Sequence, residues 1–219
     1  MTSLTLRIIT LSETLVGTGE GWGSTIDSDV VFDIYGLPFI PSKRIKGCLR
    51  ESALEVAEMF GKGGITPDWQ DKVDLLFGRP GNRISAPLRF GNLYLKDYEK
   101  EREWFEWAIQ EYPSLISRDM VLSAFTNIRQ QTTIDKTGVA KRNSLRTARV
   151  LKRGLTFSGV IEADDATVDG DALLLGALNL RYIGTKRNRG FGHIKCEILD
   201  STGKDLGNAI LGKFEKVED

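Results

Sequence analysis

The stretch SKRIKGCLRESALEVAEMF, residues 42–60, decides the fold of this 219-residue chain. Its apolar residues recur at helical spacing along one face: Ile45, Leu49, Ala53, Val56 and Phe60. Ser42 is the predicted N-cap of this helix. Before it, alternating apolar and polar residues predict a strand over Ser3–Leu11, and after it a second strand is predicted over Ile84–Leu95. Residues 3–95 therefore contain one β-α-β unit.

The second half of the chain repeats this order. It predicts a strand over Leu155–Ala163, a helix over Val168–Tyr182 and a strand over Phe191–Leu199, after an earlier strand over Val121–Asp135. Two β-α-β units favour a ferredoxin-like α+β fold, in which an antiparallel sheet carries two helices on one face. We expect one domain over residues 1–219. Its elaborations are a helical insertion at about 61–83, an acidic outer helix at 97–111 and a hairpin at about 130–153.

Composition excludes several classes of protein. With 41% hydrophobic and 27% charged residues, the chain is neither disordered nor fibrous. It contains no apolar run of membrane-spanning length and no export signal, so we expect a cytoplasmic protein without membrane contact. Cys48 and Cys196 are then expected to be reduced core residues. His193 is the only histidine, which argues against a zinc site or a Ser-His-Asp triad, so any metal would be held by oxygen.

Charge is balanced overall, with 30 basic and 30 acidic residues, but it is unevenly distributed. Three stretches contain several cations and no acid: Pro41–Arg50, Lys136–Arg153 and Asn179–Lys195. A single run of this kind is usually a solvated face. Three of them in a neutral chain indicate local anion-binding surfaces.

The first of these stretches places Lys43, Arg44 and Lys46 in the first turns of a helix. Cations there face the positive end of the helix dipole, which is unfavourable unless an anion is bound. Free amide groups and cations together form a phosphate site. The alternative is that the helix begins later and these cations lie in a loop.

The other two stretches have different chemistry. The loop GTKRNRGFG, residues 184–192, matches neither a Walker A nor a dinucleotide motif, but its glycines and cations suit a phosphodiester. Lys136–Arg153 combines cations with hydroxyl and amide side chains and almost no aromatic residue, which favours contact with a nucleic-acid backbone. Its plainer interpretation is a flexible basic hairpin.

Acidic residues close to the glycine-rich stretch Val16–Ser28 are the candidates for catalysis. An aspartate is a weak base at neutral pH, but Asp27 could act by holding Mg²⁺, which takes oxygen ligands. The alternative is that Asp27 and Asp29 cap turns.

Four motifs, which occur along the chain in the family's order, resemble the RAMP superfamily of CRISPR-associated RNA-binding proteins, and in particular the backbone subunits of type III effector complexes of the Csm or III-D type. The motifs are LPFIPSKRIKGCLR (37–50), GSTIDSDVVFD (23–33), TTIDKTGVA (132–140) and the loop 183–192. Two departures stand out. Ser42, Lys43 and Arg44 replace the small residues that usually follow Ile-Pro, and the loop before Asp27 contains Trp-Gly-Ser-Thr in place of the usual glycine and alanine.

The resemblance implies a modified RNA-recognition-motif fold with a thumb hairpin, many copies assembled as a filament on a CRISPR guide RNA, and partnership with other type III subunits. It implies that Asp27, with Mg²⁺ or another divalent cation, cleaves complementary target RNA where the thumb disrupts the duplex. The RNA-binding residues that it implies are Ser42, Lys43, Arg44, Lys46, Arg50, Thr137, Gly138, Val139, Ala140, Lys141, Lys186, Arg187, Arg189 and Gly190.

Two other functions remain open at this point. The chain could be a non-catalytic scaffold that binds guide RNA and leaves cleavage to its partners. It could also be a guide-processing ribonuclease that uses His193, although this residue lies in the loop expected to hold phosphate.

Overall fold

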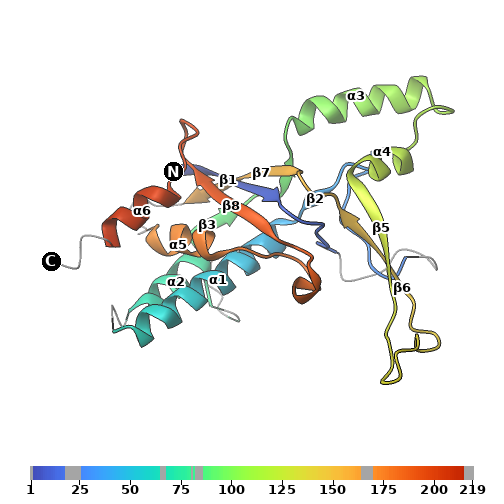
Figure 1. The fold of residues 1–219 in the computed structure, drawn as a ribbon. Coiled ribbons are helices and arrows are strands. Elements are labelled where there is room, and N and C mark those ends of the chain that lie inside the picture. Colours follow the sequence, from blue (N-terminus) through green and yellow to red (C-terminus); the bar gives the residue numbers. More distant parts are fainter. Residues whose placement is uncertain are drawn as a thin grey trace.

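The computed structural model describes residues 2–17, 26–64, 68–79, 81, 86–163 and 170–214 (Figure 1). Its strands are β1 (Thr2–Thr10), β2 (Phe39–Ile40), β3 (Leu88–Phe90), β4 (Leu93–Leu95), β5 (Thr126–Gln131), β6 (Arg146–Leu151), β7 (Thr156–Ala163) and β8 (Ile194–Leu199). Its helices are α1 (Ser42–Lys62), α2 (Trp69–Phe77), α3 (Tyr98–Glu111), α4 (Arg118–Phe125), α5 (Asp171–Asn179), the 3₁₀ turn η1 (Arg187–Arg189) and α6 (Gly207–Phe214). Most of the glycine-rich stretch, residues 18–25, lies outside the described residues.

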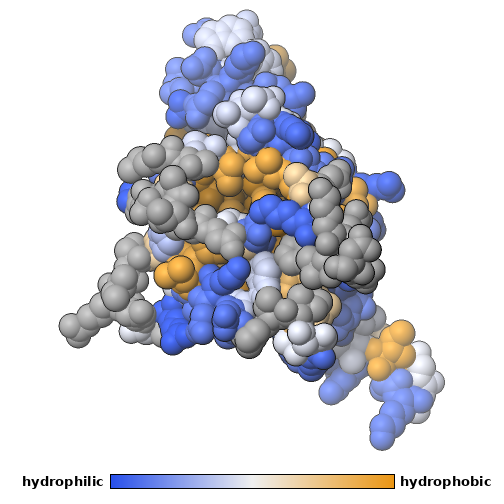
Figure 2. Space-filling view, turned by 90° about the vertical axis from the view of Figure 1, so that its left-hand side faces the viewer, coloured by the Kyte–Doolittle hydropathy of each residue, from blue (hydrophilic) through white to orange (hydrophobic). Residues whose placement is uncertain are grey.

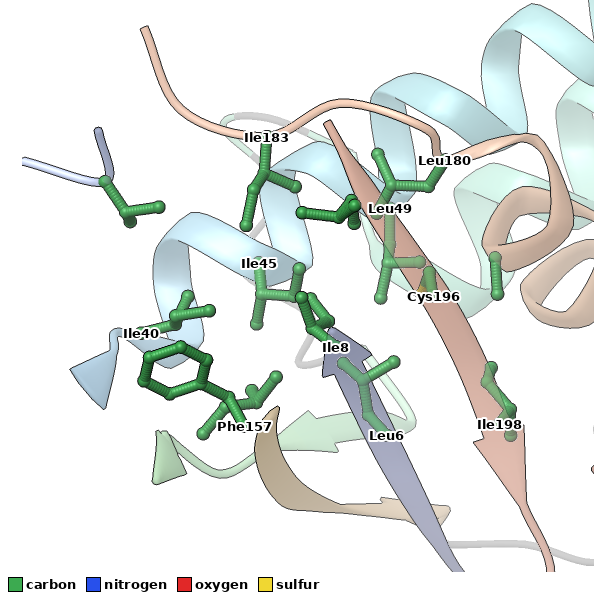
Figure 3. Packing of buried hydrophobic residues seen from close by; sticks show 14 of the residues in the cluster. Leu6, Ile8, Ile40, Ile45, Leu49, Phe157, Leu180, Ile183, Cys196 and Ile198 are labelled. Carbon is green, nitrogen blue, oxygen red and sulfur yellow. The ribbon is translucent and has the colours of Figure 1, made fainter. Parts of the chain in front are cut away.

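The main sheet has the strand order β2-β4-β7-β1-β8, and β3 also pairs with β7. Each of these pairs is antiparallel. Because β1 lies between β7 and β8, the two β-α-β units interleave, as they do in a ferredoxin-like sheet. Helices α1 and α5 lie on one face of this sheet (Figures 1 and 3). The structure therefore confirms the predicted fold class.

The core lies between this sheet face and the two helices (Figure 3). Leu6 and Ile8 of β1 are completely buried, as the alternation of the strand predicts, and so is Phe157 of β7. Each such side chain contributes roughly 1.5–3 kcal/mol through burial. The two helices touch closely, since a Cβ added to Gly176 of α5 would lie 2.9 Å from the Cβ of Ala53 in α1.

The strand predicted over Val121–Asp135 is wrong in its first part. Residues 118–125 form helix α4, and strand β5 begins only at Thr126. The Ser117 hydroxyl accepts a hydrogen bond from the Met120 amide and so caps the helix. A short apolar run suits either element, and this cap decides for helix. The C-terminal helix α6 was not predicted.

The strand predicted over Ile84–Leu95 is interrupted. A residue in the interruption binds the first residue of α1, whose start differs from the predicted one. Strands β3 and β4 are separated by Gly91 and Asn92. The Asn92 Oδ1 accepts a hydrogen bond of 2.9 Å from the Ser42 amide. Ser42 is therefore the first helical residue, and Pro41 is the N-cap without a side-chain cap bond.

Two elements project from the body on opposite sides (Figure 1). One is α3. The other is the hairpin of β5 and β6, which form a separate antiparallel sheet with Gln131 opposite Arg146. We call residues 126–151 the thumb. On the face seen in Figure 2, apolar side chains gather in the middle, with hydrophilic ones above and below them. Among the described residues, no helix combines the length and apolarity needed to cross a bilayer.

Candidate nucleic-acid interface

The start of α1 carries a cluster of positive charge. Its first turn contains no acidic residue, and the side chains of Lys43 and Arg44 are exposed. The Arg44 guanidinium donates a 2.9 Å hydrogen bond to the Gly17 carbonyl, at the edge of the glycine-rich stretch. The helix thus begins one residue earlier than predicted, and its cations lie at the positive end of its dipole, an arrangement that a bound phosphate would stabilise.

Two other cations of the same stretch, Lys46 and Arg50, bind groups of the protein. The Lys46 ammonium donates to the Leu88 carbonyl at 3.1 Å, and burial lowers its pKa. The Arg50 guanidinium donates to the Asp74 carboxylate at 2.8 Å and to the Gly78 carbonyl at 3.2 Å. These two side chains connect α1 to β3 and α2. The stretch is therefore divided between an exposed cationic side and a side that stabilises the fold.

The loop 184–192 is joined to both α1 and the thumb. Its Arg187 lies 3.7 Å from the carboxylate of Glu51 in α1. Its Lys186 donates a 3.0 Å hydrogen bond to Gln131 in β5. Arg187 and Arg189 are exposed on the turn η1. The loop thus contacts helix α1, which carries the first cationic stretch, and strand β5, which belongs to the same hairpin as the second.

The glycines of this loop serve two different purposes. Gly184 has φ +82°, and a Cβ there would lie 2.2 Å from the Leu15 carbonyl oxygen. Gly192 is confined in the same way by the Ile183 carbonyl. Gly190 also has positive φ, but a Cβ there would meet nothing within 4 Å. Close approach of the chain to itself, rather than to RNA, explains the first two glycines, whereas Gly190 faces open space.

The thumb tip is a tight turn built around one carboxylate. Asp135 Oδ1 accepts hydrogen bonds from the amide and hydroxyl of Thr137 and from the amide of Val139. The Thr137 hydroxyl and these amides hold the pKa of Asp135 below its ordinary value. The predicted RNA-binding residues of the tip are all exposed: Thr137, Gly138, Val139, Ala140 and Lys141.

The candidate catalytic residue Asp27 lies at the base of the thumb. Its Oδ2 accepts a 2.7 Å hydrogen bond from the Thr147 amide of β6, and its own amide donates to the Thr147 carbonyl at 2.9 Å. Its Oδ1 lies 3.6 Å from the Arg146 guanidinium. The Asp27 side chain remains 41% exposed. It is therefore fixed to the thumb through one oxygen, while the other lies at ion-pair distance from Arg146 on a side chain that stays partly exposed.

Two residues further on, Asp29 is buried. Its carboxylate lies 3.1 Å from the Arg149 guanidinium and accepts a hydrogen bond from the Val30 amide. Ser28, between the two aspartates, forms a parallel bridge with Ala148. Each aspartate thus has a partner in β6, a relation that the sequence did not reveal. The sequence offered one hint of this pairing: two acids lie two residues apart, and their cationic partners lie together in the basic stretch Lys136–Arg153.

The side chains near Asp27 suit a magnesium ion only if most of its ligands come from outside the protein. No group of three potential ligand side chains lies together among the described residues, so the protein alone does not enclose an ion there. Mg²⁺ is often bound by one or two carboxylates together with waters and substrate phosphates. The partly exposed carboxylate of Asp27 suits an ion that is shared with RNA.

His193 and the cysteines have structural surroundings. The His193 ring stacks on Tyr182 with centroids 5.1 Å apart, and the two residues form an antiparallel bridge. Both cysteines are free, as predicted. Cys196 is buried in the core, which raises its pKa to about 12, whereas Cys48 is only partly buried.

A family model described as the RAMP superfamily matches residues 7–195. The chain belongs to the RAMP superfamily. No curated protein matches its sequence. Among solved structures, a chain of the Type III-B Cmr-beta cryo-EM structure bound to cognate target RNA has a TM-score of 0.67 and 13% identity, over 90% of this chain and 97% of that one. The apo state of Cmr-beta gives 0.68 and 13%, over 91% and 98%. At 13% identity, the likeness shows that this chain and the two Cmr-beta chains share a fold.

Proposed function

We propose that this RAMP protein is a guide-RNA-binding subunit of a type III CRISPR effector complex, of the Csm or III-D type, and that it cleaves complementary target RNA at Asp27. Membership of the superfamily and the likeness to a Cmr-beta chain in a complex with target RNA support the first part. The single observation that carries the second is the position of the partly exposed Asp27 carboxylate at the base of the thumb.

In this proposal guide phosphates lie on the exposed cations Lys43, Arg44, Arg187 and Arg189. Gly190 leaves room for close approach of the backbone. The remaining predicted contacts have protein partners in the free chain: the Ser42 amide, Lys46, Arg50 and Lys186. Their part is to hold α1 and the loop in position, and Lys186 joins the loop to the thumb.

In this proposal the thumb tip disrupts the guide–target duplex. Asp135 preforms the turn, so Val139 and Lys141 are presented without a large ordering cost. Val139 is 61% exposed, and Ile134 beside it is 64% exposed. Apolar side chains that are exposed on a basic hairpin can enter a nucleic-acid stack, as wedges do in duplex-kinking proteins.

Cleavage would proceed by attack of a target 2′-hydroxyl oxygen on the adjacent phosphorus, with departure of the 5′-oxygen of the next nucleotide. A kinked backbone brings these atoms into line. Asp27 accepts a hydrogen bond from the attacking hydroxyl, fixes its direction and takes up its proton, and water protonates the departing 5′-oxygen. A divalent cation, when bound by Asp27 and the phosphate, supplies charge stabilisation. The Thr147 amide holds the carboxylate in place.

The test is target-RNA cleavage by the assembled complex, with parent and Asp27→Ala subunits, in Mg²⁺ and in EDTA. We expect regularly spaced products from the parent. Substitution or chelation should reduce the cleavage rate by about a hundredfold or more, because positioned acid–base and metal effects are of that size. Guide binding should persist in the variant.

A non-catalytic scaffold is the second candidate, and one observation favours it. The Asp27 carboxylate already has protein partners in Thr147 and Arg146, as expected for a residue that only anchors a loop. Uncut target that is bound normally by the parent complex would establish this alternative.

We further propose that other copies of the chain, in a filament, and other type III subunits are protein partners. Helix α3 supports a protein contact rather than an RNA contact. Trp104 and Trp107 are half-exposed on it, and Tyr112 packs edge-on against Trp107. Acidic residues, which repel phosphate, are frequent along the same helix. Trp107→Glu should weaken assembly in light-scattering measurements on guide RNA but leave guide binding by the single subunit unchanged.

A further inference from the structure

A small cavity lies beside the proposed guide surface. Its volume is about 170 Å³, and its walls come from α1, from the C-terminal end of α5 and from the segment that leads to η1. Drug-sized ligands usually occupy roughly 300–1,000 Å³, so this cavity suits a single ring system. Six of its lining residues carry the argument that follows: Glu51, Glu55, Asn179, Arg181, Tyr182 and Arg187.

Two carboxylates line one wall. Glu51 and Glu55 are one turn apart on α1 and are both exposed. Glu55 accepts a 2.9 Å hydrogen bond from the Asn179 amide, which fixes its position. Among the described residues, Glu51 has only the 3.7 Å ion pair with Arg187. The Glu51 oxygens are therefore available to accept hydrogen bonds from a ligand.

An aromatic side chain lines another part of the cavity. Tyr182 is 42% exposed, and its ring stacks on His193 at an interplanar angle of 28°. The bridge between the two residues fixes this geometry. A pre-oriented and partly exposed ring of this kind is what single-stranded RNA uses as a stacking platform.

Arg187 joins the cavity to the basic loop, because it lines the cavity and lies on η1. A nucleotide with its phosphate on the loop would therefore have its base at the cavity. Carboxylates select bases that offer N–H groups, and they disfavour uracil, whose Watson–Crick edge is mostly carbonyl oxygen. Guanine offers two adjacent N–H donors to one carboxylate, and its O6 can accept from the guanidinium of Arg181.

We propose that this cavity binds one unpaired guanine base of a bound RNA. Glu51 accepts hydrogen bonds from the guanine N1–H and N2–H groups, Arg181 donates to O6, and Tyr182 stacks on the ring. This inference rests on the proposed RNA binding and adds a base preference to it. It makes this part of the surface a reader of sequence, whereas the phosphate contacts are indifferent to sequence.

The test measures the affinity of the full chain for two fluorescent single-stranded RNAs, an all-uridine oligomer and the same oligomer with one central guanosine. We expect the guanosine oligomer to bind at least about fivefold more tightly, since one good bidentate contact discriminates by that much or more. Glu51→Gln should abolish the preference, and inosine, which lacks the N2 amino group, should reduce it. Glu58→Gln is the matched control, because Glu58 lies on α1, pairs with Lys62 and is not among the residues that line the cavity.

Equal affinity of the parent for both oligomers would overturn the cavity assignment and leave RNA binding intact. A preference that survives Glu51→Gln would also overturn it. Failure of both oligomers to bind would contradict the proposed function itself. Because the readout is a ratio of two affinities, a general gain in RNA binding from the release of Arg187 does not affect the result.

Discussion

Asp29 and Arg149 form the buried ion pair that fixes the Asp27 segment to the thumb. The Asp29 side chain is only 4% exposed and that of Arg149 17%. Arg149→Met leaves the carboxylate buried without its cation, so we predict that the free energy of unfolding falls by about 3 kcal/mol. Chemical denaturation measures it. Arg146→Ala is the control, since its pair with Asp27 is long and exposed and its loss should cost less than about 1 kcal/mol.

The loop glycines give a second prediction at this scale. Gly184→Ala combines a positive φ with a backbone clash at Leu15 and should destabilise the protein severely. Gly190→Ala meets only the conformational penalty, about 1–2 kcal/mol. Thermal unfolding of the two variants compares them. Equal losses of stability in the two variants would show that the close contact with the Leu15 carbonyl does not restrict position 184.

Helix α1 separates two kinds of cation by the side of the helix on which they lie. Lys43→Ala should leave stability unchanged and reduce the slope of log affinity against log salt by about 0.7, the value for one phosphate contact on a single strand. Arg50→Ala should instead lower stability, because it releases Asp74. RNA titrations at several salt concentrations test this, with the exposed Lys100 of α3 as control. A slope that is unchanged in Lys43→Ala would remove this residue from the interface.

The sequence predicted those elements in which pattern and local chemistry agree. The alternation in β1 and the helical spacing in α1 depend on burial against one face, which periodicity reports directly. Helix α4 was missed because the short apolar run Met120–Leu122 does not distinguish helix from strand. The contacts of Asp27 with Thr147 and of Asp29 with Arg149 join residues about 120 apart, and no local pattern encodes such pairings.

At the scale of the whole molecule, several carboxylates are stabilised in their charged form. Burial opposes ionisation of Glu197, but hydrogen bonds from Lys195 and Arg7 hold its pKa below the ordinary value of 4.5. The folded protein therefore binds fewer protons than the unfolded chain in this range, and stability is lost as pH falls below about 4.5 and through the folded pKa. In denaturation at several pH values, Glu197→Gln should be less stable at neutral pH and show a shallower loss in acid. An unchanged acid slope would contradict this assignment.

The central claim is that α1, the loop 184–192 and the thumb form one RNA-binding face, which we call the guide surface. Its most direct test is photochemical cross-linking of 4-thiouridine-labelled guide RNA in the assembled complex, with the modified peptides located by mass spectrometry. We predict adducts in residues 42–50, 137–141 and 186–190. Adducts confined to the acidic helix α3, or absent from all three segments, would contradict the claim.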